Sequence, residues 1–124
     1  MGSVSKISDS EWNIMKIIWD NPGCTAMFII EKLKDSSEWK PKTIKTLIRR
    51  LVDKEIVGYV QDGREYKYHS LVNESECKRK EGISFLDRVY GGSLKAMMLN
   101  FMESDDISTK DIEDLRKILN EKEK

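Results

Sequence analysis

Residues 39–53, WKPKTIKTLIRRLVD, constrain the fold of this chain more than any other stretch. Pro41 can occupy the first turn of a helix, where the missing N–H of proline is not needed. Apolar residues then recur at steps of three and four, which is typical of the packed side of a helix, and they are Ile44, Leu47, Ile48 and Leu51. Basic and hydroxyl side chains fall largely off this stripe. The stretch therefore predicts a helix that packs by one side and presents cations and hydroxyls on the other, as a helix in the major groove of DNA must.

A β-hairpin is predicted directly after this helix. Residues 56–61 are β-branched and aromatic, and Asp62-Gly63 is the strongest short hairpin signal that a sequence can contain. Residues 65–71 then alternate strictly between two faces, with Tyr66, Tyr68 and Ser70 on one and Glu65, Lys67 and His69 on the other. We expect the tyrosines to pack within the hairpin rather than to stack on bases, and Arg64 to lie at its tip.

Two more helices are predicted before residue 39. Ser8 followed by Glu11 forms a capping box that starts a helix over residues 8–20, and Asn21-Pro22-Gly23 ends it. A second helix is predicted over residues 26–34, with Met27, Ile30 and Leu33 on one side and Phe28 and Ile29 flanking them. Between them, Cys24-Thr25 is too short for a true strand but can pair as a short edge. Three helices followed by a hairpin are the order of a winged helix-turn-helix.

The character of the chain changes after Leu71. Helices are predicted over residues 74–90 and 93–103 and from Ser108 onward, and the middle one is apolar on most sides, so it must be buried. Because the segment is short for a core of its own, we expect two chains to bury these helices against each other, in addition to what one chain buries alone. The residues expected at this dimer interface are Phe85, Leu86, Val89, Tyr90, Leu94, Met97, Met98, Phe101, Leu115, Ile118 and Leu119.

The predicted fold is therefore mainly α with a small β-hairpin. It comprises a winged-helix DNA-binding domain over residues 1–72 and a helical dimerisation domain over residues 73–124. Dimerisation would relate two copies of the helix in residues 39–53, the recognition helix, by a two-fold axis. The expected partners are thus a second copy of the chain and a palindromic double-stranded DNA operator.

The distribution of charge favours nucleic acid as the partner. The net charge of the whole chain is zero, but residues 40–54 carry six cations and a single acid, Asp53. The N-terminal half of a recognition helix usually reaches base edges, whereas later arginines contact phosphates and hairpin cations contact phosphates or the minor groove. The candidate DNA-binding residues are Lys42, Thr43, Lys45, Thr46, Arg49, Arg50, Arg64 and Lys67.

Motifs for other functions are missing from the sequence. It contains no GxGxxG, P-loop, GxSxG or HExxH pattern and no residue pair placed for catalysis, so we predict no enzyme, no catalytic residue and no cofactor. His69 is the only histidine and lacks neighbours at ligand spacing, so no metal site is expected. Cys24 and Cys77 are far apart, which favours reduced thiols and a cytoplasmic protein. No apolar run is long enough to insert into a membrane.

Several stretches resemble the penicillinase-repressor (BlaI/MecI) family of winged-helix repressors. They are ISDSEWNIMKIIW, WKPKTIKTLIRRLVDKEIV, EYKYHSLV, VYGGSLKAMMLNF and DIEDLRKILN, in collinear order over about residues 7–120. The resemblance implies a homodimer on palindromic operators, often with TACA/TGTA half-sites, that silences β-lactamase or related resistance genes. It also implies release by proteolysis when a membrane sensor-protease binds a β-lactam, with Asn100-Phe101 matching the scissile bond.

Two departures from this family pattern matter. Lys40 stands where relatives can have a serine cap, which leaves the start of the recognition helix without one. The sequence has no C-terminal CxC pair, which argues against the copper-responsive branch of the family. Two other functions stay open: a winged-helix repressor that answers a different signal, and a winged-helix adaptor that binds protein without binding DNA. Enrichment of a palindrome from random duplexes would exclude the adaptor.

Overall fold

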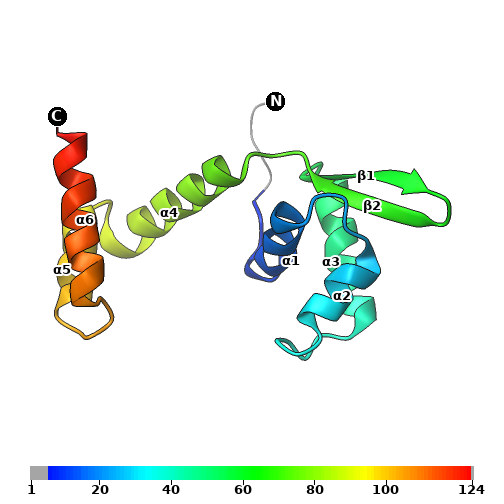
Figure 1. Ribbon diagram of the computed structural model, residues 1–124, viewed down its shortest axis with the longest axis horizontal. Coiled ribbons are helices and arrows are strands. Elements are labelled where there is room, and N and C mark those ends of the chain that lie inside the picture. The colour runs from blue at the N-terminus through cyan, green and yellow to red at the C-terminus, as the bar shows by residue number, and fades with distance from the viewer. Residues whose placement is uncertain (1–5, 124) are drawn as a thin grey trace. The chain divides into compact units, whose positions relative to one another are not determined.

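The computed structural model describes residues 6–123. Its elements in chain order are α1 (Asp9–Asp20), α2 (Ala26–Leu33), α3 (Pro41–Asp53), β1 (Val57–Asp62), β2 (Glu65–Ser70), α4 (Glu74–Tyr90), α5 (Leu94–Met102) and α6 (Thr109–Lys122) (Figure 1). They form two compact units, one ending at Cys77 and one beginning at Lys78, so α4 starts in the first unit and continues in the second. The predicted fold class, mainly α with a two-stranded hairpin after three helices, is confirmed.

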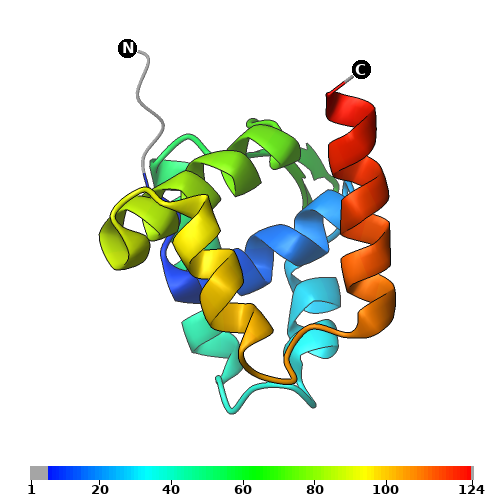
Figure 2. The same ribbon diagram turned by 90° about the vertical axis from the view of Figure 1, so that its left-hand side faces the viewer.

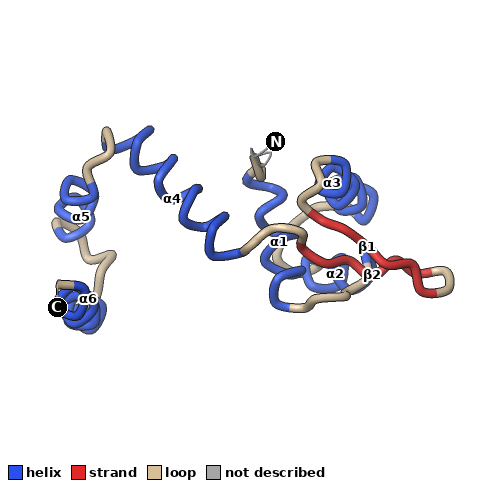
Figure 3. Tube along the Cα trace, turned by 90° about the horizontal axis from the view of Figure 1, so that it is seen from above, coloured by secondary structure: helices blue, strands red, loops and turns tan. Residues whose placement is uncertain are grey.

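One side of each of the first three helices builds the core of the first unit. The apolar stripe predicted for α3 is confirmed, since none of its four residues is more than 6% exposed. The other core residues are Ile14, Met15 and Ile18 of α1, Ile29, Ile30 and Leu33 of α2, and Ile7, Cys24, Ile56 and Val57 outside the helices. Figure 3 shows the three helices grouped together and the hairpin projecting beyond them.

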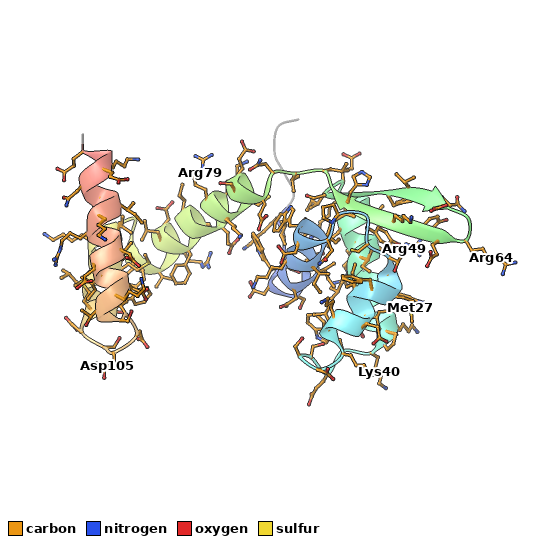
Figure 4. The ribbon with its side chains drawn as sticks, viewed as in Figure 1. Met27, Lys40, Arg49, Arg64, Arg79 and Asp105 are labelled. Atoms are coloured by element: carbon orange, nitrogen blue, oxygen red, sulfur yellow. The ribbon has the colours of Figure 1, made fainter. Side chains whose placement is uncertain are left out.

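The packed side of α2 differs from the prediction. Met27, predicted on the same side as Ile30 and Leu33, is 60% exposed, while the flanking Ile29 is fully buried. The reason lies in helix geometry, because a step of three residues falls short of a full turn of about 3.6 residues and drifts around the helix. Ile29 and Leu33, a step of four apart, stay on the buried side with Ile30. The exposed Met27 lies on the outer side of α2 (Figure 4).

The hairpin is antiparallel, and its turn is displaced by one residue from the expected position. Asp62 pairs with Glu65, so Gly63 and Arg64 are the two central residues of the turn. Gly63 has a φ of +66°, whereas Arg64 has no positive φ, as in a type II′ turn with glycine first. The geometry places Arg64 at the tip, as predicted.

Two contacts attach the hairpin to the helices. Cys24 forms an isolated antiparallel bridge with Tyr68, which confirms the short edge expected there. The indole Nε1 of Trp19 donates to the hydroxyl of Ser70 at 2.9 Å. The inner end of the hairpin is therefore held between α1 and the segment that precedes α2.

An ion pair between Lys54 and the buried carboxylate of Glu11 connects the end of α3 to the start of α1. The predicted capping box is confirmed: Glu11 N–H donates to Ser8 Oγ at 3.2 Å, and Ser8 N–H donates to Glu11 Oε1 at 2.9 Å. The same Oε1 accepts a hydrogen bond from Lys54 Nζ at 2.6 Å, although Glu11 is only 1% exposed. Lys54 Nζ also donates to the carbonyl oxygen of Lys6 at 2.9 Å. Lys54, one of the six cations in residues 40–54, is thus engaged with Glu11 and Lys6 of the first unit.

The second unit has a different character, because none of its residues between 78 and 123 is buried. Ser93 caps α5 and Ser108 caps α6, each by accepting a backbone N–H. In Figure 2, α5 and α6 stand apart and are joined by residues 103–108. The apolar side chains of these helices are thus largely unpacked in a single chain. Within residues 6–123, no helix is long and apolar enough to cross a membrane.

We predict that Glu11→Gln destabilises the first unit by about 1–2 kcal/mol at pH 7, because Lys54 loses its charged partner. Burial alone would raise the pKa of Glu11, but the hydrogen bonds from Lys54 and Ser8 outweigh it and hold the pKa below the ordinary value of 4.5. A lowered carboxyl pKa stabilises the fold above the unfolded-state value and ceases to do so as the pH falls through the folded-state value. The gap between wild type and variant should therefore narrow below about pH 4.5.

Urea denaturation at one fixed protein concentration measures this gap. The control is Asp114→Asn, which breaks the exposed Lys110–Asp114 pair and should change little. A Glu11→Gln deficit of the same size at pH 7 and well below pH 4 would contradict the ion-pair explanation.

Candidate nucleic-acid interface

The exposed side of α3 carries six of the predicted DNA-binding residues. On a helix of about 3.6 residues per turn, Lys42, Thr46 and Arg49 occupy the middle of this side. Lys45 lies on one flank, and Thr43 and Arg50 lie on the other. All six side chains are exposed. The burial of the opposite stripe therefore leaves a continuous basic and hydroxyl surface along the helix.

The start of α3 is set by its proline rather than by a side-chain cap. Lys40 occupies the N-cap position and makes no side-chain capping hydrogen bond, while Pro41 follows in the first turn. The Thr46 hydroxyl donates to the carbonyl oxygen of Lys42 at 3.0 Å. The proton of Thr46 is therefore used within the helix, and its oxygen lone pairs are what it offers outward.

The two predicted cations of the hairpin have different surroundings. Arg64 extends from the turn into solvent (Figure 4). Lys67 forms an ion pair with Asp62 of the neighbouring strand, with Nζ 2.8 Å from Oδ2. This contact lowers the pKa of Asp62 and raises that of Lys67, so both groups keep their charges. Arg64 is thus directed outward, whereas Lys67 is partnered across the hairpin.

The arrangement of these parts suits an anionic groove. Figure 4 shows Arg49 on α3 just beneath the hairpin and Arg64 beyond its tip. The chain turns from α3 to β1 through Glu55, which has a φ of +63°, so the hairpin follows the helix directly. A protruding basic helix with a basic loop beside it can neutralise several phosphates while its centre reaches base edges.

A second predicted site, Asn100-Phe101, lies in the last turn of α5. The hydroxyl of Tyr90 donates to Asn100 Oδ1 at 3.0 Å. The ring of Tyr90 meets Phe101 edge to face, with centroids 6.4 Å apart, and contacts Phe85 at 6.1 Å. Tyr90 therefore touches both residues of the predicted scissile bond. Asn100 is exposed and Phe101 is partly buried.

Six of the eleven predicted dimer-interface residues are exposed apolar side chains of the second unit. Phe85, Val89, Leu94, Leu115, Ile118 and Leu119 are exposed, whereas Leu86, Tyr90, Met97, Met98 and Phe101 are partly buried. Leu99 and Met102, which the prediction did not include, are also about half exposed. Both residues belong to α5, which is apolar on most sides. This feature of the sequence could have predicted their exposure.

Cysteine and histidine side chains form no further site among residues 6–123. Cys24 is buried, and no disulfide joins it to Cys77. In this part of the chain, no three potential metal-ligating side chains gather. His69 lies above Gly58, whose missing side chain leaves room for its ring, since a Cβ there would come within 3.0 Å of the His69 Nε2.

Fold and surface together define a winged-helix protein whose exposed recognition helix is basic. The model of the penicillinase repressor family matches residues 7–121, and the chain belongs to this family. The resemblance of the quoted sequence stretches to that family is thereby confirmed.

Two relatives are similar over nearly their whole lengths. The methicillin resistance regulatory protein MecI of Staphylococcus aureus (strain N315) is 43% identical over 117 residues, which cover 94% of this chain and 95% of that protein. The penicillinase repressor of Bacillus licheniformis is 37% identical over 121 residues, which cover 98% of this chain and 94% of that protein.

Solved structures agree on the first unit. The DNA-binding domain of the repressor BlaI superposes with a TM-score of 0.55 at 34% identity, covering 61% of this chain and 93% of the domain. The monomeric form of Bacillus licheniformis BlaI in complex with the blaP half-operator gives a TM-score of 0.53, also at 34% identity and with the same coverage. That relative thus binds DNA with a unit of this fold.

Proposed function

We propose that this chain is a homodimeric transcriptional repressor of a β-lactamase or related antibiotic-resistance gene. It binds a palindromic operator and is inactivated by proteolytic cleavage when an antibiotic is sensed. The observation that carries the proposal is the family match over residues 7–121, on a chain whose α3 exposes a basic side. The relatives described above include a methicillin-resistance regulator and a penicillinase repressor.

DNA binding is assigned to α3 and the hairpin. In the proposed complex, Lys42, Lys45 and Thr46 read base edges from the exposed side of α3. Arg50 and Arg64 bind phosphates, and Arg49, in the middle of that side, reaches either. Thr43 remains a contact predicted from the sequence, whereas Lys67 is paired with Asp62 and is assigned no contact in this complex. Lys54 is excluded from this set, because it is engaged with Glu11.

Dimerisation is assigned to the second unit. Its helices expose Leu94, Leu99, Ile118 and other large apolar residues, and none of residues 78–123 is buried within one chain. Surface of this kind is unfavourable in water and typical of an interface. A two-fold axis through this region would relate two recognition helices, which should enter successive major grooves about 34 Å apart. The division into DNA-binding residues 1–72 and dimerisation residues 73–124 belongs to this proposal.

Release of the operator is assigned to cleavage between Asn100 and Phe101. The bond lies in a helix, so a protease must first unwind the end of α5, where Tyr90 holds both residues. Cleavage there would separate α6 from the rest of the chain and remove part of the proposed dimer interface. A membrane sensor-protease system would supply the signal. The second candidate function is a repressor of the same architecture that answers a different signal. The residues of α3 that would bind DNA are compatible with either signal.

We predict that Lys45→Ala and Arg50→Ala weaken DNA binding in different ways. Lys45→Ala should lower affinity for a preferred palindrome by about tenfold more than affinity for a random duplex, because a base contact is lost. Arg50→Ala should weaken both equally and reduce the slope of log K against log salt by about 1.8, since the dimer loses two phosphate contacts. Gel-shift titrations over a series of salt concentrations measure both effects.

Lys16→Ala, on the exposed side of α1, is the matched control for loss of a cation and should change neither quantity. Equal weakening of all duplexes by Lys45→Ala would reassign Lys45 to a phosphate. If the wild-type protein enriches no palindrome from random duplexes at moderate salt, the repressor function is refuted. A winged-helix adaptor that binds protein and not DNA would then be the favoured function.

We predict that Ile118→Asp weakens the dimer by at least 100-fold. Each interface would lose two apolar side chains and gain two charges, because the change occurs in both copies. Sedimentation velocity over a concentration series measures the dissociation constant. Val60→Asp is the control, because Val60 is 60% exposed like Ile118 but lies on the hairpin. An unchanged dimer with Ile118→Asp would remove Ile118 from the interface.

We predict that Phe101→Ala abolishes cleavage of the chain after β-lactam treatment of cells that carry a penicillinase sensor-protease. Mass spectrometry of the wild type should find one fragment that ends at Asn100 and another that begins at Phe101. Met102→Ala, one residue beyond the bond, should still be cleaved and serves as the control. Cleavage of the Phe101→Ala protein at the same bond would refute this assignment.

A further inference from the structure

The register of the hairpin separates two chemically different faces. Tyr59 pairs with Tyr68 and Gln61 pairs with Tyr66, so these four side chains share the face that also carries Val57 and Ser70. Val57 is 1% exposed, and Ser70 accepts the hydrogen bond from Trp19. This face therefore turns toward the helices of the first unit.

Three tyrosines form a cluster along this face. The rings of Tyr59 and Tyr66 lie with centroids 4.6 Å apart, and Tyr59 lies 6.2 Å from Tyr68. Tyr68 is partly buried against the core, which anchors the cluster at its inner end. Tyr59 is nevertheless 47% exposed and Tyr66 43% exposed. The expectation that these tyrosines pack within the hairpin holds, yet two of them keep much of their surface in solvent.

The opposite face of the hairpin presents the ion pair of Lys67 with Asp62. His69 lies on that face as well, over Gly58. A cation paired with a carboxylate on a face turned away from the helices is poorly placed to meet a duplex lying against α3.

The outer part of the hairpin extends beyond the helices, and Tyr66 lies nearer the turn than Tyr59, which pairs with Tyr68. Figure 3 shows the hairpin extending past α2 and α3, and Figure 4 shows Arg49 on α3 beneath it and Arg64 beyond its tip. In the proposed complex, the helix-facing side of the hairpin, which carries Tyr59 and Tyr66, borders the DNA that lies against α3. A duplex whose major groove takes up α3 would bring its nearer sugar–phosphate strand into this space.

We propose that Tyr59 and Tyr66 form the DNA-facing side of the hairpin, which is the wing of this winged-helix fold. Their hydroxyls donate to phosphates of the operator, whereas Lys67 makes no DNA contact. This inference rests on the proposed function and identifies the part of the wing that binds. Duplex bases are stacked on one another, so the occupant is the backbone and not a base. Continuity with the basic side of α3 and with Arg64 at the tip supports this occupant.

The chemistry of a phenol suits this role. Tyrosine hydroxyls are regular donors to phosphate oxygens, and a donor that carries no charge releases no counterion when it binds. Mutual packing of the rings orders them before DNA arrives, so little side-chain freedom is lost on binding. The tyrosines should thus add affinity that does not depend on salt, in contrast to Arg64.

The test uses the full-length protein with Tyr59→Phe and Tyr66→Phe combined, which keeps both rings and removes only the hydroxyls. The probes are a fluorescent duplex with an inverted pair of TACA/TGTA half-sites and a random duplex of equal length. The double variant should bind both duplexes about tenfold more weakly, with an unchanged slope of log K against log salt. Arg64→Gln should reduce that slope by about 1.8, and Lys67→Gln should leave both affinity and slope as in the wild type.

The outcomes separate this inference from the proposed function. If the wild type binds the palindrome and the double phenylalanine variant binds equally well, the tyrosine contact is refuted and the repressor stands. A lower salt slope with Lys67→Gln would place Lys67 on a phosphate and would also refute the inference. If the wild type prefers no duplex, the proposed function fails, and the inference fails with it. Thermal unfolding of each variant verifies that the ring cluster remains intact.

Discussion

Burial of one side of α3 is the constraint on which the rest of the first unit depends. Ile44, Leu47, Ile48 and Leu51 fill the centre of a small core, and their removal from water fixes the rotation of the helix about its axis. The basic and hydroxyl residues must then face outward. The ion pair of Glu11 with Lys54 fixes the C-terminal end of α3 to the start of α1. Rotation and position of the recognition helix thus follow from interactions on its hidden side.

The second unit poses the opposite physical situation. Its helices are capped and regular, yet none of residues 78–123 is buried in a single chain. The proposed dimer resolves this, because a second copy would cover surface that one chain leaves in water. It also links the two proposed sites, since a cut at Asn100-Phe101 falls within the surface that would hold the copies together. Tyr90, which touches both residues, would then oppose both unwinding of α5 and its cleavage.

The two cations of the hairpin have different surroundings that a count of charges in the sequence does not reveal. By sequence, Arg64 and Lys67 are equivalent cations of one hairpin. In the structure, Lys67 forms an ion pair with Asp62 across the strands, while Arg64 extends from the turn. The exposed chemistry on the helix-facing side of the outer hairpin is aromatic and hydroxyl rather than basic. In the proposed complex, the wing therefore contributes contacts of a kind that differs from those of α3.

Local chemistry was readable from the sequence alone. The capping box of Ser8 and Glu11, the first-turn Pro41, the period of the α3 stripe, the hairpin with Arg64 at its tip and the family itself all depend on neighbouring residues or on short motifs, and each was predicted. Only the tertiary structure decided that Glu11 meets Lys54, 43 residues away, that Met27 is exposed while Ile29 is buried, and that the exposed tyrosines and Lys67 lie on opposite faces of the wing. The reason is physical: periodicity and caps act within one turn or one strand, whereas the partner of a side chain depends on which elements pack together and at what rotation.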